Sequence, residues 1–120
     1  MGIFSKLFKK EKFKNPEEYY IVTISNASVK VEHPERKTEN IKWASIEEIK
    51  LVNTDEGPIS PDIWLVLLGK ESMCLIPHGA EGFDEVYDII SKYPDFSFEN
   101  FGKSMTCTDN AEFVLWKKKE

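Results

Sequence analysis

Residues 63–77 read IWLVLLGKESMCLIP, and their pattern indicates the kind of fold that the chain adopts. Two apolar runs, IWLVLLG and SMCLIP, are joined around the polar, glycine-containing segment 69–71. Runs of this length and composition are typical of buried strands, and a short polar connection with a glycine is typical of a turn. The stretch therefore predicts a hairpin of two buried strands. IWLVLLG is also the longest apolar run, far below the roughly 18–20 residues that cross a bilayer.

The residues before this hairpin predict further strands. YYIVTIS (19–25) is rich in β-branched and aromatic residues, while SVKVEH (28–33) and TENIKW (38–43) alternate apolar and polar residues. Alternation with a period of two places one face of a strand on the core and the other in water. The segments SNAS and PERK separate these strands as turns, and a short turn at 44–47 precedes a strand through Val52.

The residues after the hairpin predict two helices and a last strand. Apolar residues at i, i+3, i+4 and i+7 form a helical stripe, and acidic residues occupy its first turns, where the helix dipole favours them. This pattern predicts a helix at about 80–92, with the stripe Phe83, Val86, Tyr87 and Ile90 and the acids Glu81, Asp84 and Glu85. FSFENFGKSM (96–105) predicts a second, shorter helix, and AEFVLWKKK (111–119) predicts a strand.

These elements predict an α+β protein of about seven mostly antiparallel strands, arranged as a small barrel or bent sheet capped by the helix at about 80–92. ENIKWASIEEIKLV (39–52), the hairpin and this helix resemble bacterial pleckstrin-homology-like domains over roughly residues 19–93. Those domains pair an I-x-W strand with an x-E-I-x-x-V strand and cover one barrel end with a helix. The resemblance implies a scaffold that binds lipids, peptides or proteins. Residues after Pro94 are additional, and no basic lipid-headgroup motif matches between residues 19 and 30.

Length and composition indicate one globular domain at residues 15–120, preceded by a distinct segment at 1–14. The chain has 120 residues, of which 41% are hydrophobic and 31% charged. Its two cysteines are too few for a disulfide framework, so we expect reduced thiols. The start of the chain lacks the unbroken apolar stretch of a secretory signal, which favours the cytoplasm.

Charge divides the chain in the same place. Residues 1–14 hold five lysines and one acid, a charge of +4, whereas the remaining residues carry −9. An acidic body with the single arginine Arg36 disfavours nucleic acid as a partner. Segment 1–14 has an apolar side and a basic side, so it is predicted to lie on the inner membrane face or a partner, to dock on its own domain, or to be disordered. The residues expected to make the membrane or partner contact are Ile3, Phe4, Lys6, Leu7, Phe8, Lys9 and Lys10.

Candidate catalytic and metal-binding residues are scarce. Cys74 and His78 lie four residues apart, but along a strand their Cα atoms would be about 13 Å apart, beyond the reach of a nucleophile–base pair. Strand parity instead places Cys74 in the core. His33 stands alone in a turn and Cys107 in a polar loop, which gives no metal-ligand spacing. We therefore expect no catalytic residues, no metal and no cofactor.

Two main hypotheses for function follow, beside a small enzyme, for which no spacing of residues along the chain gives support. The first is a non-enzymatic binding module, peripheral to the membrane through its N-terminal segment, with a homodimer through the C-terminal strand as a further possibility. The alternative is an acidic immunity-type or inhibitor protein that neutralises a basic toxin or nuclease. Three tryptophans in predicted strands, Trp43, Trp64 and Trp116, favour core packing, or binding anchors where one faces outward. The acidic contact surface of the alternative is Glu47, Glu48, Asp55, Glu56 and Asp62.

Overall fold

The computed structural model describes residues 19–54, 63–107 and 109–119. Seven strands, one 3-10 helix and two α-helices follow each other along this part of the chain. Their order is β1 (Ile21–Ile24), β2 (Ser28–His33), β3 (Arg36–Lys42), η2 (Trp43–Ser45), β4 (Glu48–Asn53), β5 (Ile63–Leu68), β6 (Met73–Pro77), α2 (Phe83–Ile90), α3 (Phe98–Thr106) and β7 (Ala111–Lys117). None of the helices in these ranges combines the length and the apolar character needed to cross a membrane.

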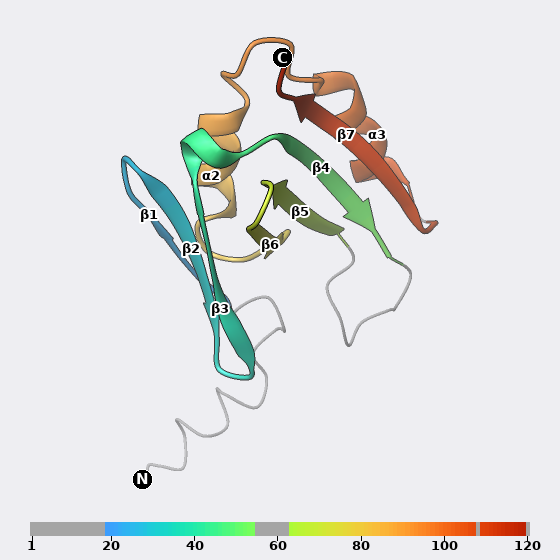
Figure 1. The fold of residues 1–120 in the computed structure, drawn as a ribbon. Coiled ribbons are helices and arrows are strands. Elements are labelled where there is room, and N and C mark those ends of the chain that lie inside the picture. The colour runs from blue at the N-terminus through green and yellow to red at the C-terminus, as the bar shows by residue number, and fades with distance from the viewer. Residues whose placement is uncertain (1–18, 55–62, 108, 120) are drawn as a thin grey trace, which may run out of the picture.

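The strands form two antiparallel sheets. One sheet has the order β1-β2-β3 and the other the order β6-β5-β4-β7. Figure 1 shows the sheets facing each other, with α2 between them at one end and α3 beside β7. The predicted α+β class with seven mostly antiparallel strands is confirmed. The described strands do not close into one barrel, so the finer pleckstrin-homology-like architecture stays a prediction.

The core lies between the two sheets and under α2. Alternate residues of each strand point inward, as the period of two requires: Val29 and Val31 on β2 are buried, as are Ile49 and Leu51 on β4. The helical stripe predicted from the sequence supplies the remaining wall, because Phe83, Val86 and Ile90 of α2 are also buried. The three tryptophans are half-buried and pack against this core, as predicted.

Several element boundaries differ from those predicted. Helix α2 covers 83–90 rather than about 80–92, because Gly79 and Gly82 adopt positive φ angles of 102° and 100°, which end any helix before residue 83. Strand β3 begins at Arg36, inside the predicted PERK turn. Trp43 begins η2 instead of ending a strand, and its indole Nε1 donates to the Ser25 carbonyl at 2.8 Å.

The outer edge of β7 is occupied by the segment that leads into α3. The Ser97 amide donates to the Leu115 carbonyl at 2.8 Å, and the Asn100 side-chain amide donates to the Val114 carbonyl at 2.7 Å. A strand pairing across β7 in a dimer would have to displace both bonds. The dimer stays a prediction, and these contacts weigh against it.

Candidate functional site

The two sheets meet where the edge strands β3 and β6 lie side by side. β3 is the last strand of one sheet and β6 the first strand of the other, and they make tertiary contacts without pairing through their backbones. An edge strand presents a row of backbone N–H and C=O groups that a further strand can use. The backbone directions of β3 and β6 therefore determine what this junction can bind.

On β3, the backbone groups of Asn40 and Lys42 point away from β2. The Trp43 amide donates to the Ala27 carbonyl at 3.0 Å, which makes residues 43 and 27 a hydrogen-bonded pair. Hydrogen-bonded and non-hydrogen-bonded pairs alternate along an antiparallel ladder. In the observed register Ile41 faces Val29 and forms the next hydrogen-bonded pair, so Asn40 and Lys42 are left with outward backbone groups.

On β6, the same reasoning leaves Met73 and Leu75 with outward backbone groups. The Gly69 amide donates to the Ser72 carbonyl at 2.9 Å and the His78 amide donates to the Ile63 carbonyl at 2.8 Å, so even-numbered residues pair with β5. Pro77 has an outward position as well but carries no N–H. The outward N–H groups of β6 are therefore those of Met73 and Leu75.

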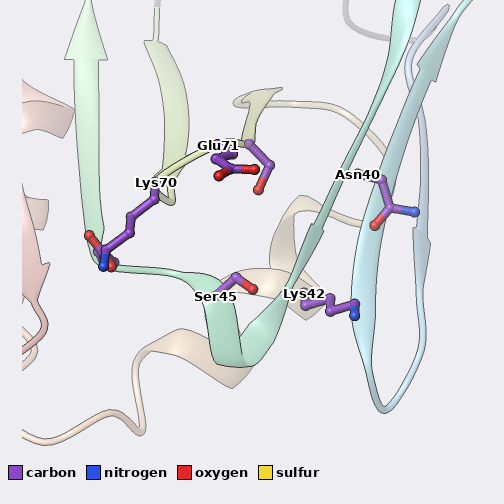
Figure 2. Close-up of a pocket in the computed structure, with 7 residues that line it drawn as sticks. Asn40, Lys42, Ser45, Lys70 and Glu71 are labelled. Atoms are coloured by element: carbon purple, nitrogen blue, oxygen red, sulfur yellow. The ribbon is translucent and has the colours of Figure 1, made fainter.

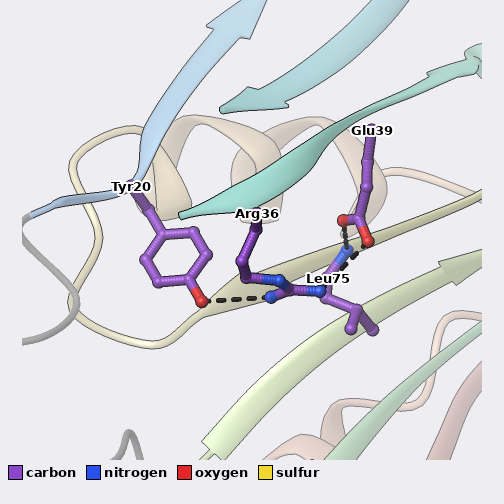
Figure 3. A network of polar contacts seen from close by, with 4 residues as sticks. All are labelled: Tyr20, Arg36, Glu39 and Leu75. Carbon is purple, nitrogen blue, oxygen red and sulfur yellow. Dashed lines mark hydrogen bonds and ion pairs between the residues drawn. The ribbon is translucent and has the colours of Figure 1, made fainter. Parts of the chain in front are cut away.

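A polar cluster closes one end of the space between the strands (Figure 3). The Glu39 carboxylate accepts the Leu75 amide at Oε1, 2.8 Å away, and lies 3.3 Å from Arg36 Nη2 at Oε2. The other guanidinium nitrogen, Nη1, donates to the Tyr20 hydroxyl at 3.0 Å. We call these four residues, Tyr20, Arg36, Glu39 and Leu75, the Glu39 junction. The Glu39 side chain thus takes the place that a neighbouring strand's carbonyl would have.

Aromatic rings hold the guanidinium in this position. The Arg36 Cζ lies 5.8 Å from the ring centroids of both Tyr20 and Trp64, within cation–π range. The hydrogen bond with Tyr20 raises the pKa of Arg36, although burial acts in the opposite direction. The arginine is therefore a fixed positive charge that orients Glu39 toward β6.

Beside the Glu39 junction, a groove follows β3 toward η2 (Figure 2). Two adjoining hollows of about 510 and 520 Å³ share Asn40 and the β5–β6 turn, and together they define what we call the β3–β6 groove. Gly69 sets how closely this turn approaches η2, because a Cβ atom there would lie 2.8 Å from the Ser45 carbonyl oxygen. The groove is lined by residues 37–40, 42, 45, 47 and 68–73.

The groove lining is polar and charged. It carries charges of both signs: Lys42 and Lys70 are positive, and Glu47 and Glu71 are negative. The hydroxyl groups of Ser45 and Ser72 also line it. Among these lining residues there is no cysteine or histidine that could act as a nucleophile or activate a serine. Such a surface offers hydrogen bonds, opposite charges and free backbone edges to a ligand.

The structure places Cys74 in the core and His78 at the surface. Cys74 is fully buried, as predicted from strand parity, and its Sγ lies 3.7 Å from the Val29 carbonyl oxygen. Burial raises the pKa of this thiol to about 12, with the negative charge of Glu39 adding to the shift. The reactive thiolate is therefore absent at neutral pH. His78 is exposed, and its ring packs edge-on against Phe83 at 5.0 Å.

Most of the predicted contact residues lie outside the described ranges. These are the N-terminal residues Ile3, Phe4, Lys6, Leu7, Phe8, Lys9 and Lys10, and the loop acids Asp55, Glu56 and Asp62. Of the two remaining acids, Glu47 lines the β3–β6 groove, and Glu48 is half-buried at the start of β4 opposite Lys117. The acidic-inhibitor alternative therefore stays a prediction.

Sequence reasoning missed the Glu39 junction and the exposed carboxylates of α2. In the sequence, Arg36 stands out only as the one arginine of the chain, and Glu39 only as part of an alternating strand. Strand alternation could have paired Arg36 with a nearby acid, but not with Leu75, which is 36 residues away in sequence. The sequence indicates only a helix-dipole role for Asp84 and Glu85, whereas in the structure they also line a surface groove together with Asp88.

Comparison with protein-family models, curated proteins and solved structures found no match to this chain. The geometry of the β3–β6 groove is therefore the basis for a functional proposal.

Proposed function

We propose that this chain is a non-enzymatic binding module that holds an extended polypeptide segment in the β3–β6 groove. The observation that supports the proposal is the pair of neighbouring edge strands whose outward backbone groups are not bonded to each other. An extended peptide that adds to such an edge gains affinity from main-chain hydrogen bonds and specificity from its alternate side chains.

The Glu39 junction limits where the added segment can lie. Glu39 already bonds the Leu75 amide, so the ligand occupies the part of the groove that begins at Asn40 and ends near Ser45. There it would pair with the outward backbone groups of Asn40 and Lys42. The exposed side chain of Met73 supplies an apolar contact on the opposite wall.

The charges of the groove define the ligand further. Lys42 and Lys70 would attract acidic side chains, and Glu47 and Glu71 would attract basic ones. A segment that carries charges of both signs fits this lining better than a uniformly acidic or basic one. Because the lining carries charges of both signs, a free phosphate or a polymer of a single charge sign would be a poor ligand.

The proposal is tested with peptides selected on the full chain from a random displayed library and then measured by calorimetry. Asn40→Pro removes the outward N–H that the added strand needs, at a position where proline does not break the β2–β3 ladder. We expect it to weaken peptide binding by about tenfold or more, the equivalent of one lost backbone hydrogen bond.

The matched control is Asn40→Ala, which removes the same side chain and keeps the N–H. It should bind the selected peptides nearly as the unmodified chain does. Equal affinities of Asn40→Pro and Asn40→Ala, both folded, would contradict strand addition at β3.

The N-terminal segment remains a second proposed contact, with an anionic membrane surface. Its +4 charge and its apolar side, which includes Phe4 and Phe8, support the proposal. Co-sedimentation of the full chain with vesicles rich in anionic lipid should be lost in the variant Phe4→Ser/Phe8→Ser and at high salt. Binding that survives both changes would contradict a contact through this segment.

A further inference from the structure

A second groove, between β1 and α2, has a composition different from that of the β3–β6 groove. It has a volume of about 460 Å³ and is lined by Ile24, Asp84, Glu85, Asp88 and Ile89. The two isoleucines are half-buried and form an apolar floor, while the three acids are exposed. The groove therefore combines an apolar surface with a wall of one charge sign.

The wall is negative because helix geometry aligns its acids. Asp84 and Asp88 are one turn apart on α2, as are Glu85 and Ile89. Asp88 pairs with Lys92 at 3.4 Å on the surface, whereas Asp84 and Glu85 make no ion pair within the described ranges. At least two carboxylates of the wall are thus available to a basic occupant.

We propose that this groove is the docking site of the chain's own N-terminal segment, residues 1–14. The segment has the complementary composition, with four apolar side chains on one side and five lysines against one acid. Its apolar residues would cover Ile24 and Ile89, and its lysines would face Asp84 and Glu85. Neither feature of the groove fits the mixed-charge ligand proposed for the β3–β6 groove.

The connection along the chain favours this occupant over a separate protein. The described part begins at Tyr19, two residues before β1, and β1 leads directly to Ile24 in the groove. The four residues of β1 span only about 13 Å, whereas the preceding 18 residues can reach as far as about 60 Å. Asn15-Pro16 is typical of a turn that would reverse the segment along β1. Tethering raises the effective concentration of the segment at the groove to about the millimolar range.

Docking has a consequence for the proposed membrane contact. The same apolar residues and lysines that would enter a membrane surface are covered when the segment lies on α2. The docked and membrane-bound forms exclude each other, so loss of docking increases vesicle binding by the full chain.

Paramagnetic broadening in the full chain tests the docking directly. A spin label is attached at Ser5→Cys in a Cys107→Ser background, which preserves every apolar residue and lysine of the segment. At low salt the amide signals of Ile24 and of residues 84–89 should lose most of their intensity. The loss should disappear in Asp84→Asn/Glu85→Gln/Asp88→Asn and persist in the control Glu35→Gln/Glu99→Gln/Asp109→Asn, which changes the net charge equally.

Two results would overturn the proposal. One is broadening that is absent, uniform, or centred on another surface, in which case the acidic groove has a different occupant. The other is equal broadening in the two neutralised variants, which would show nonspecific attraction to the acidic body. Neither result depends on peptide or vesicle binding, so the docking and the proposed function can fail separately.

Discussion

Glu39 connects the two sheets at the scale of a single residue. Its carboxylate satisfies the Leu75 amide on β6 and neutralises Arg36, whose other side contacts Tyr20 and Trp64. A buried or half-buried N–H without an acceptor costs about 1–3 kcal/mol. Since β3 and β6 make no backbone bonds with each other, this side chain supplies the polar contact that a paired strand would otherwise provide.

Substitution of Glu39 should therefore lower the free energy of unfolding. The size of the effect should depend on whether the contact with the Leu75 amide, the contact with Arg36, or both are lost. Glu39→Ala removes both contacts and is expected to lower the free energy of unfolding by about 1–3 kcal/mol. Glu39→Gln keeps a neutral acceptor for the Leu75 amide and should cost clearly less. Urea denaturation measures both, with the exposed Glu35→Ala as the control. Equal stability of all three variants would show that the junction does not hold the sheets together.

Cys74 should make the stability of the chain decrease at alkaline pH. Its pKa is raised from 9.0 to about 12 by burial, so between these values the folded chain keeps a proton that the unfolded chain has released. The contribution of Cys74 to the free energy of unfolding is therefore fully present below about pH 9. Above that pH it falls as the pH rises, by up to about 1.4 kcal/mol for each pH unit.

The comparison variant is Cys74→Ala, which has no thiol to titrate. Urea denaturation at neutral pH and at about pH 10.5 should show that the stability advantage of the unmodified chain shrinks as the pH rises. Burial also raises the pKa of Tyr93, but that residue is common to both proteins and cancels in the difference. A difference that is independent of pH would contradict the account of Cys74.

At this scale the sequence predicted core positions better than polar ones. Strand parity predicted that Cys74 is buried, because parity depends only on neighbouring residues. The predicted strand ends at Val52, whereas Asn53 belongs to β4 and is buried. Its side chain donates to the Ser104 carbonyl at 2.8 Å and accepts from the Ser104 hydroxyl at 2.5 Å. That partner is 51 residues away, and no local pattern indicates it.

At the scale of elements, the short segments between strands shape the groove. The β5–β6 turn and η2 approach so closely at Gly69 that a Cβ atom would lie 2.8 Å from the Ser45 carbonyl oxygen. A backbone oxygen cannot move away as the end of a flexible side chain can. The close approach of the β5–β6 turn to η2 therefore depends on Gly69, which has no side chain. This approach forms one end of the β3–β6 groove.

Two glycine substitutions should consequently act in opposite directions. Gly69→Ala is expected to lower the free energy of unfolding by about 1–3 kcal/mol, because the turn must shift away from η2. Gly102→Ala, within α3 and with no atom within 4 Å of the added Cβ, should raise it by about 0.5–1 kcal/mol. Thermal denaturation of both variants provides the test. A Gly69→Ala variant as stable as the unmodified chain would mean that η2 and the turn are not in contact.

The sequence predicted which elements exist but not how they join. Both helices and all seven strands follow from the composition and periodicity of short segments, which are local properties. The conversion of Trp43 and the next two residues into η2 depends on the indole contact with Ser25, which lies 18 residues earlier. The shorter α2 depends on the positive φ of Gly82, whose Cβ would lie 2.9 Å from that of Val22 on β1.

At the scale of the molecule, the decisive feature is a pair of antiparallel sheets whose edge strands β3 and β6 lie side by side without backbone pairing. Two sheets of three and four strands share one core, but their facing edges meet through the Glu39 side chain. The opposite edge of the second sheet, β7, is already bonded by Ser97 and Asn100. Of these two junctions, the one at β3 and β6 has outward backbone groups next to a groove.

The sequence does not indicate whether the strands close into one barrel or form separate sheets. A strand count of about seven is compatible with a barrel, a bent sheet or two sheets, because closure depends on bonds between strands far apart in the chain. The candidate site lies at that junction. It was therefore missed for the same reason, although its lysines, acids and Met73 were all visible as exposed positions of predicted strands and turns.

Hydrogen exchange at single amides of β3 is the most direct test of strand addition in the β3–β6 groove. In the free chain, the outward amides of Asn40 and Lys42 should exchange faster than that of Ile41, which is bonded to β2. When a selected peptide is bound, Asn40 and Lys42 should both become protected while Ile41 changes little, the alternating signature of an added strand. Protection at β1 or α2, or a complex with no change on β3, would contradict the assignment of the β3–β6 groove as the binding site.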